Sequence, residues 1–189
     1  MAAQNTQHQL RHAAAWSNNV NHYTLALDIE AYERDQSKLT EIGWTIDNVN
    51  APQISHHFVV QENVHLRNGR YVPDNKFGFN FGRTDTLPLY EILRRLREDI
   101  CSRPLLAMVG HGIAHDIRYL QSVGFSFSPG TKFFDTNNLY REFSASMQSK
   151  HKLQTILVQL GIPHSGLHNA GNDAYYTMEA FLVMCARGY

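Results

Sequence analysis

Residues 23–33 read Tyr23-Thr24-Leu25-Ala26-Leu27-Asp28-Ile29-Glu30-Ala31-Tyr32-Glu33, an apolar run that ends with two acids one residue apart. The run predicts a buried strand, and because side chains alternate between the two faces of a strand, Asp28 and Glu30 point the same way. Two adjacent carboxylates repel each other and are costly to desolvate. A divalent cation is the usual remedy, and oxygen ligands favour Mg²⁺ or Mn²⁺ over zinc. The alternative is an exposed strand end whose acids are merely solvated.

Length and composition are those of one folded domain. The 189 residues are enough to bury a full core, and ten Phe, nine Tyr and two Trp argue against a disordered chain. The 17 basic residues (Lys and Arg) balance the 17 acidic ones, so the formal net charge is zero. A neutral chain has no overall field that attracts a polyanion, so any contact with nucleic acid has to be local or mediated by metal.

Cysteine usage and the lack of long apolar runs bear on cellular location. Cys101 and Cys185 lie in segments of helical character, and two reduced thiols are expected rather than a disulfide. No apolar run reaches membrane-spanning length, and the N-terminus lacks the hydrophobic core of a secretion signal. We therefore expect an intracellular protein, cytoplasmic or nuclear, with no membrane partner.

The hydrophobic pattern predicts a mixed order of strands and helices. Residues 1–20 are expected to be an N-terminal tail or frayed helix, and residues 21–189 one domain. Strands are expected over residues 23–30, 39–46 and 54–60 as a meander, and then over 105–109 and 131–134. Helical segments are expected over residues 87–100, 114–122, 138–143 and 152–160, and from about 169 almost to the C-terminus. This order implies an α/β fold, with a mixed five-stranded sheet flanked by helices on both faces.

Residues 61–88 form the least regular stretch of the chain. Basic and aromatic side chains alternate there: His65, Arg67, Arg70, Tyr71, Lys76, Phe77, Phe79, Phe81 and Arg83. Such a mixture suits single-stranded nucleic acid, because the charges bind phosphates and the rings stack on bases. The alternative is a long loop that its Phe residues fix to the core. That alternative is favoured for the Phe residues, and the role of the basic residues stays open.

Two further acids stand at the ends of later elements, where sites in open α/β sheets form. Asp116 lies in the first turn of the helix that follows strand 105–109, and Asp173 lies at the start of the last helix, five residues after His168. Each acid alone is explained as a helix N-terminal residue that the helix dipole stabilises. His168 alone is explained as a loop histidine.

Together these residues resemble the DEDDh group of 3′-to-5′ exonucleases in the ribonuclease-H-like superfamily. The matching residues are Asp28 and Glu30 in the first motif, Asp116 in the second, and His168 with Asp173 in the third. The resemblance runs from about Tyr23 to Arg187 and includes Glu41-Ile42-Gly43 and Phe134-Asp135-Thr136.

A finer resemblance concerns a fungal branch of this group. It is carried by three segments, which are residues 28–33, residues 36–43 (Gln36-Ser37-Lys38 and Thr40-Glu41-Ile42-Gly43), and residues 168–173 (His168-Asn169-Ala170-Gly171-Asn172-Asp173). That branch includes yeast proteins linked to DEAD-box helicase function and an Argonaute-associated exonuclease of RNA silencing. It therefore implies an Argonaute or an RNA helicase as a protein partner.

The resemblance implies an enzyme that removes 5′-monophosphates from the free 3′ end of single-stranded RNA or DNA by a two-metal mechanism. Asp28 would bridge two Mg²⁺ or Mn²⁺ ions, Glu30 and Asp173 would bind the first ion, and Asp116 the second. His168 would take the proton of the attacking water. The residues implied to contact the substrate are Ala31, Tyr32 and His111.

Two rival interpretations compete with the exonuclease. The pairs His111/His115 and His164/His168 have a spacing that suits zinc on a helix, but glycines interrupt both segments and no Glu follows the first His. A catalytically inactive nucleic-acid-binding or scaffold module is the stronger rival, because nuclease folds are reused with dead sites. Against it, a dead site has no physical reason to keep clustered, mutually repelling carboxylates.

Overall fold

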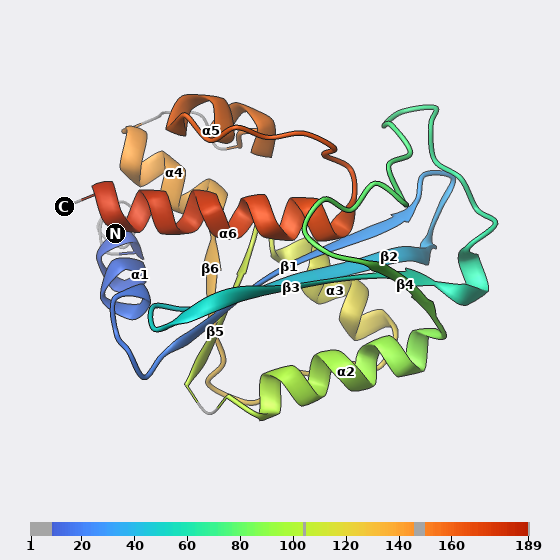
Figure 1. Cartoon of the computed structure of the whole chain (residues 1–189), viewed down its shortest axis with the longest axis horizontal. Coiled ribbons are helices and arrows are strands. Elements are labelled where there is room, and N and C mark those ends of the chain that lie inside the picture. The colour runs from blue at the N-terminus through green and yellow to red at the C-terminus, as the bar shows by residue number, and fades with distance from the viewer. Residues whose placement is uncertain (1–8, 104, 146–149, 189) are drawn as a thin grey trace, which may run out of the picture.

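A mixed six-stranded sheet forms the centre of the molecule (Figure 1). This computed structural model describes residues 9–103, 105–145 and 150–188. The strands are β1 (Tyr23–Tyr32), β2 (Asp35–Asn48), β3 (Ala51–Val60), β4 (Thr84–Leu87), β5 (Leu106–Gly110) and β6 (Lys132–Asp135). Their order in the sheet is β4-β3-β2-β1-β5-β6. The strands β1 to β3 form the expected antiparallel meander, and β4, β5 and β6 pair in parallel with β3, β1 and β5.

The fold class expected from the sequence is confirmed, with one strand more than the five expected. The additional strand, β4, lies inside the irregular stretch 61–88 and pairs with the edge of β3. It has only four residues, Thr84-Asp85-Thr86-Leu87, with a single apolar side chain. Too short and too polar for an alternating pattern, it is recognisable only from its pairing partner.

Helices cover both faces of the sheet, as Figure 1 shows. They are α1 (Gln9–Ser17), α2 (Leu89–Cys101), α3 (Ala114–Ser122), α4 (Thr136–Ser144), α5 (Leu153–Leu160) and α6 (Ala170–Arg187), with a short 3₁₀ turn, η1, at Gln61–Asn63. One core layer lies between the sheet and α6 with α1, α4 and α5, and the other lies under α2 and α3. Among the described residues, no helix has both the length and the apolar character that a bilayer-spanning segment requires.

The N-terminal helix α1 lies within the stretch expected to be a tail or frayed helix. Leu10, Ala13 and Ala14 are buried in the core layer of α6. The backbone N–H of Leu10 donates a hydrogen bond to Glu142 Oε2 of α4 at 3.0 Å. Residues 1–8 lie outside the described residues, and the division into 1–20 and 21–189 stays a prediction.

The strand β1 separates the two layers by simple alternation. Leu25 and Leu27 pack under α2 and α3, whereas Ala26 packs under α6. Asp28 and Glu30 continue the register of Ala26, so both acids emerge on the α6 side at the end of the strand.

A close approach between β2 and α6 brings the start of α6 to that same end of the sheet. A Cβ atom on Gly43 of β2 would lie 2.4 Å from the backbone of Ala170 and Gly171. Because Gly43 has no side chain, the first turn of α6 rests directly on the strand beside β1. The acid in that turn, Asp173, is thereby placed near the acids of β1.

Candidate active site

Four acids from three elements converge at the end of β1. Asp28 and Glu30 come from β1, Asp116 from the first turn of α3 and Asp173 from the first turn of α6. Asp116 Oδ1 accepts a hydrogen bond from the backbone N–H of Ile29 at 3.1 Å, which fixes α3 to the strand between the two β1 acids. Thus the structure brings together the four acids that the sequence singled out.

Burial raises the pKa of each of these carboxyl groups, and the charges of neighbouring acids add to the effect. Desolvation is the largest cause, and it raises the pKa of Glu30 and of Asp116 to about 8 and that of Asp173 to about 7. The pKa of Asp28 is raised well above its ordinary value by desolvation and then by the charges of Asp173, Asp116 and Glu30. Four acids in this state form a site that favours a bound cation.

A fifth acid, Glu41, lies next to this cluster. Glu41 faces Glu30 directly across the β1–β2 pair, and its charge raises the pKa of Glu30. The register of the two strands then shifts at Ala31 and again at Tyr32. Such bulges re-aim side chains and are common beside functional sites.

The donor atoms available here fit a hard divalent cation. Glu30, His168 and Asp173 each offer one ligand atom, and these atoms lie within 4.8 Å of one another. Asp173 Oδ2 accepts the backbone N–H of His168 at 3.0 Å, whereas its buried Oδ1 has no hydrogen-bond partner in the described part of the chain. A buried, unpartnered carboxylate oxygen is costly unless a ligand satisfies it. Predominantly oxygen donors favour Mg²⁺ or Mn²⁺.

The zinc interpretation gains no support from this geometry. Among the described residues, the group of Glu30, His168 and Asp173 is the one cluster with suitable metal-ligand geometry, and it contains neither complete histidine pair. The ring Nδ1 of His164 bonds to the carbonyl of Ile162 instead.

His168 is held in an unusual backbone conformation at the edge of the cluster. Its φ of 65° lies in the left-handed region, which residues other than glycine adopt rarely and which the surrounding structure has to maintain. The next residue, Asn169, caps α6, and its Oδ1 accepts the backbone N–H of Asn172 at 3.0 Å. Desolvation by the neighbouring chain, and then the charge of Lys152, lowers the pKa of His168 from its ordinary value, which favours the neutral imidazole near pH 7.

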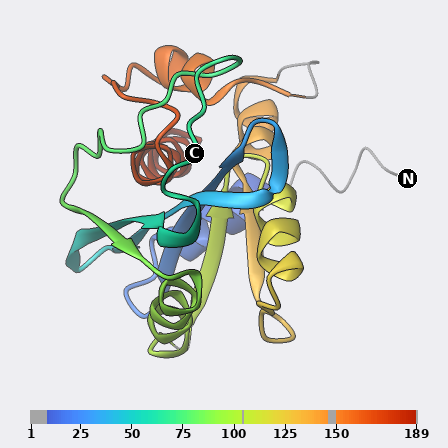
Figure 2. The ribbon, with the colours of Figure 1, turned by 90° about the vertical axis from the view of Figure 1, so that its right-hand side faces the viewer.

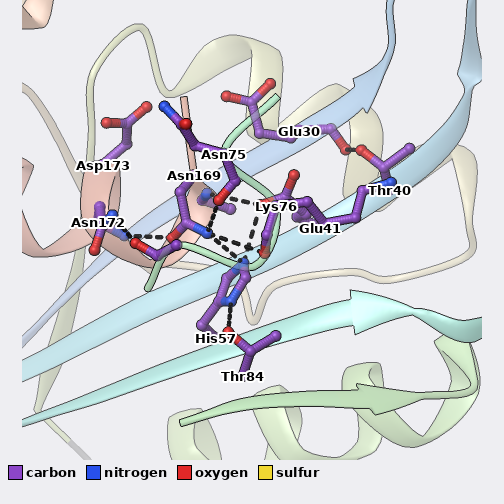
Figure 3. A network of polar contacts seen from close by, with 12 residues as sticks. Glu30, Thr40, Glu41, His57, Asn75, Lys76, Thr84, Asn169, Asn172 and Asp173 are labelled. Carbon is purple, nitrogen blue, oxygen red and sulfur yellow. Dashed lines mark hydrogen bonds and ion pairs between the residues drawn. The ribbon is translucent and has the colours of Figure 1, made fainter. Parts of the chain in front are cut away.

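A buried polar network supports this segment from below (Figure 3). His57 of β3 bonds through Nε2 to Glu41 Oε2 at 3.0 Å and through Nδ1 to Thr84 Oγ1 at 2.9 Å. Asn169 Nδ2 donates to the carbonyls of Asn75 and Lys76 at 3.0 and 3.2 Å. Glu41 Oε2 also accepts the backbone N–H of residue 170 at 3.3 Å. The network ties β2, β3, the loop after β3 and the start of α6 into one unit.

Sequence reasoning missed most of this network. Glu41 and Asn169 were named through their motifs, and Lys76 as a basic residue of the irregular stretch, but their contacts with one another were not predicted. His57 lies in a strand of mixed polarity, and its partner Asn169 is 112 positions away along the chain. The local signal that could have pointed to the network is the pair of polar residues at 169 and 172, which are spaced as an N-cap and its third helical residue.

The phenylalanines of the loop after β3 divide into two kinds. Phe79 packs beside His57 with ring centres 5.3 Å apart, and Phe81 stacks on Tyr175 with ring centres 3.5 Å apart. These two rings fix the loop to the core, as expected. The same expectation is wrong for Phe77, a residue that is 56 % exposed.

The three residues expected to contact substrate have different surroundings. Ala31 and Tyr32 end β1 next to the acids, and the carbonyl of Ala31 accepts a hydrogen bond from Asn68. His111 uses both ring nitrogens within the protein, Nδ1 with Thr136 Oγ1 at 2.9 Å and Nε2 with the carbonyl of His151 at 2.8 Å. The structure thus makes His111 part of the framework, and a substrate contact of any of the three stays a prediction.

Comparison with known proteins identifies the class of protein that this fold and site define. A family model described as "DNA polymerase III subunit epsilon-like, C-terminal domain", of the DEDDh type, matches residues 23–184. The chain belongs to this DEDDh exonuclease family, which confirms the resemblance found in the sequence. Exonucleases of this kind use divalent metal ions.

Its curated relatives are fungal. An uncharacterized nucleolar protein of Schizosaccharomyces pombe is 36% identical over 166 residues, which cover 85% of this chain and 68% of that protein. The Saccharomyces cerevisiae protein named "Good for full DBP5 activity protein 2" is 31% identical over 201 residues, which cover 84% of this chain. This chain spans 34% of the length of that second relative.

Solved structures share the fold at low sequence identity. Exonuclease I from Methylocaldum szegediense has a TM-score of 0.58 at 15% identity, over 88% of this chain and 41% of that one. A 3′-exonuclease studied with a histone mRNA stem-loop has a TM-score of 0.58 at 15% identity, over 90% of this chain and 84% of that one. The RNase domain of yeast Pop2 has a TM-score of 0.53 at 14% identity, over 97% of this chain and 83% of that one. The fold is therefore ribonuclease-H-like.

The raised pKa values predict how the stability of the metal-free protein depends on pH. Carboxyl groups with a pKa near 7 or 8 in the folded state, against about 4 in the unfolded chain, keep protons that the unfolded chain releases. We expect the melting temperature in EDTA to fall as pH rises from about 5 to about 8. Mg²⁺ at pH 8 should raise the melting temperature again. At a concentration of about 100 times Kd, the bound ion adds about 2.7 kcal/mol to the free energy of unfolding.

Thermal unfolding followed by circular dichroism checks this expectation. The double substitution Asp28→Asn with Glu30→Gln should weaken the pH dependence, because only Asp116 and Asp173 then keep raised pKa values, and should abolish the response to Mg²⁺. A melting temperature that is indifferent to both pH and Mg²⁺ would contradict the assignment of a cation site.

Proposed function

We propose that this chain is a metal-dependent 3′–5′ exonuclease that hydrolyses single-stranded RNA or DNA from a free 3′ end and releases 5′-monophosphates. The observation that carries the proposal is the convergence of four desolvated carboxylates beside an exposed histidine. Membership of the DEDDh exonuclease family supports it. The 3′-exonuclease among the solved structures supports the direction of cleavage.

The residues proposed to hold two divalent cations, Mg²⁺ or Mn²⁺, are Asp28, Glu30, Asp116 and Asp173. Bound there, such ions polarise the scissile phosphate and stabilise negative charge on the attacking and leaving oxygens. The protein contributes rigidity, because two of the carboxylates, Asp116 and Asp173, are fixed by backbone N–H groups. No rearrangement of these two acids is needed at the moment of reaction.

His168 is proposed as the general base. Its imidazole lies at the edge of the carboxylate cluster, and its lowered pKa keeps the ring neutral at physiological pH. A neutral ring nitrogen accepts the proton of the attacking water as the oxygen bonds to phosphorus. The hydrogen bond from the His168 backbone to Asp173 couples the position of the base to that of the acid.

The proposed substrate, cellular location and protein partner are supported by the relatives and the structural neighbours. Among the structural neighbours, one is an exonuclease I complex with single-stranded DNA and another recognises an RNA stem-loop. A cytoplasmic or nuclear location is proposed, and the S. pombe relative is named as nucleolar. The name of the S. cerevisiae relative refers to DBP5 activity, and an RNA helicase or an Argonaute protein is proposed as the protein partner.

A gel time course tests the proposal. Single-stranded RNA and DNA of the same sequence, each labelled at the 5′ end, are incubated with the protein in Mg²⁺, in Mn²⁺ or in EDTA. We expect the labelled strands to form a ladder that shortens from the 3′ end as the protein releases 5′-monophosphates. In EDTA, the strands should keep their full length. A circular single strand, which has no 3′ end, is the matched control and should stay intact. No cleavage of either linear strand by folded protein would overturn the proposal in favour of an inactive nucleic-acid-binding module.

A further inference from the structure

Residues 66–80, which we term the loop wall, connect the two segments that carry the site residues. At one end, the Asn68 side chain donates to the carbonyl of Ala31 at 3.1 Å and accepts the backbone N–H of Glu33 at 2.9 Å. The Glu33 carboxylate accepts the backbone N–H groups of residues 69–71. This end is therefore fastened to the strand end that follows Asp28 and Glu30.

The other end of the loop wall is fastened beside His168. The Asn75 side chain donates to the carbonyl of Leu167, and Asn172 Nδ2 donates to the carbonyl of Gly78 at 2.8 Å. Figure 2 shows this loop rising beside the β1–β2 hairpin and reaching the segment before α6. The loop wall thus borders the candidate active site from the acids of β1 to the histidine.

Internal contacts hold the loop wall in one shape. Lys76 is buried, and its Nζ donates to the carbonyl of Leu66. Arg67 forms an ion pair with Asp74 across the loop. A loop held this firmly presents its outward side chains in a defined arrangement, at little further cost in conformational entropy on binding.

Two large aromatic side chains project from this loop into solvent. Tyr71 is 70 % exposed and Phe77 is 56 % exposed. Each has a guanidinium beside its ring: that of Arg70 lies 5.2 Å from the ring centre of Tyr71, and that of Arg67 lies 5.9 Å from the ring centre of Phe77. Arg70 differs from Arg67 because it takes part in no ion pair within the described residues.

We infer that the loop wall binds the single strand upstream of its 3′ end, with Tyr71 stacking on a base and Arg70 binding a phosphate. The inference rests on the proposed function, because the wall borders the site that would receive the 3′ end. An open ring stacks on any unpaired base, whereas the bases of a duplex are already stacked on one another. The neutral chain offers no overall attraction for a polyanion, so an unpaired guanidinium beside the site supplies it locally.

Fluorescence anisotropy with a labelled single strand of about 16 nucleotides tests this inference. The measurements use Mg²⁺ and the Asp28→Asn background, in which degradation of the strand is expected to be about 10³-fold slower. We expect Tyr71→Ala to raise Kd about tenfold and Tyr71→Phe to leave it unchanged, because the ring is what stacks. Arg70→Gln should make the negative slope of log K against log salt shallower by about 0.7. The matched control is Tyr90→Ala, since Tyr90 is 72 % exposed on α2, across the sheet from α6.

The outcomes separate this inference from the proposed function. With Asp28 restored, Tyr71→Ala should reduce kcat/KM on the long strand and leave a trinucleotide unaffected. An active enzyme in which Tyr71→Ala and Arg70→Gln bind like the parent protein overturns the inference and leaves the function standing. An inactive protein in which Tyr71→Ala still weakens binding overturns the function and supports the inference. The inference is also overturned if Tyr90→Ala weakens binding of the single strand as much as Tyr71→Ala does. The same holds if Tyr71→Ala weakens binding of a blunt duplex as much as binding of the single strand.

Discussion

Replacing Asp28 by Asn is expected to lower the exonuclease rate about 10³-fold and to stabilise the metal-free protein. Asn keeps the shape of the side chain and removes its charge. Cations held at such a site stabilise the transition state by several kcal/mol, and about 4 kcal/mol corresponds to three orders of magnitude in rate. The carboxylate of Asp28 is repelled by the charges of Asp173, Asp116 and Glu30, so its removal relieves repulsion in the folded state.

Two measurements on the same protein check both halves of this expectation. The rate of 3′-end trimming should fall, while the melting temperature in EDTA at pH 8 should rise. Such a trade between stability and activity is common where a site stores repulsion. The matched control is Asp47→Asn, an acid at the far end of β2 that pairs with the start of β1 and whose pKa is also raised by burial. Its rate should stay within about twofold of the parent. Full activity in Asp28→Asn would show that the carboxylate cluster is not catalytic.

Replacing His168 by Asn is expected to lower kcat by about 10² to 10⁴, the range of a lost general base. Asn tolerates the left-handed backbone region, so the segment that precedes α6 keeps its conformation. The carboxylates remain, and the stabilisation by Mg²⁺ should therefore persist. Imidazole added to the assay should restore part of the kcat of His168→Asn, because it can act as the missing base.

These readouts distinguish a general base from a metal ligand. Loss of the Mg²⁺-induced rise in melting temperature would show that His168 binds the cation, together with Glu30 and Asp173. The control is His164→Asn, in the same segment, whose ring packs edge-on to Tyr176 and bonds to a backbone carbonyl. Its kcat should match that of the parent protein.

Several features of the site follow from local sequence pattern alone. Strand alternation places Asp28 and Glu30 on one face, and the structure has both on the α6 side. The ends of the apolar run 105–109 and of the last loop predict Asp116 and Asp173 in first helical turns, where both are found. Such inferences succeed because they depend on periodicities of two and 3.6 residues, which are written in neighbouring positions.

Other features depended on tertiary contacts. The strand β4 exists because β3 offers it an edge, and His111 is engaged by Thr136 and the carbonyl of His151 rather than being left open to a substrate. The buried contact of His57 with Asn169 joins positions 112 apart. No local pattern encodes which distant backbone group a polar side chain will meet.

The loop wall shows most clearly which features follow from local sequence and which depend on tertiary contacts. The sequence by itself determined that residues 61–88, which include the loop wall, mix basic and aromatic residues, and it left the roles of the basic residues open. Only the packed structure decided that Phe79 and Phe81 face the core while Tyr71 and Phe77 face solvent. An irregular loop has no period that assigns its side chains to a face, so its anchors at Ala31 and Leu167 decide which ones are exposed.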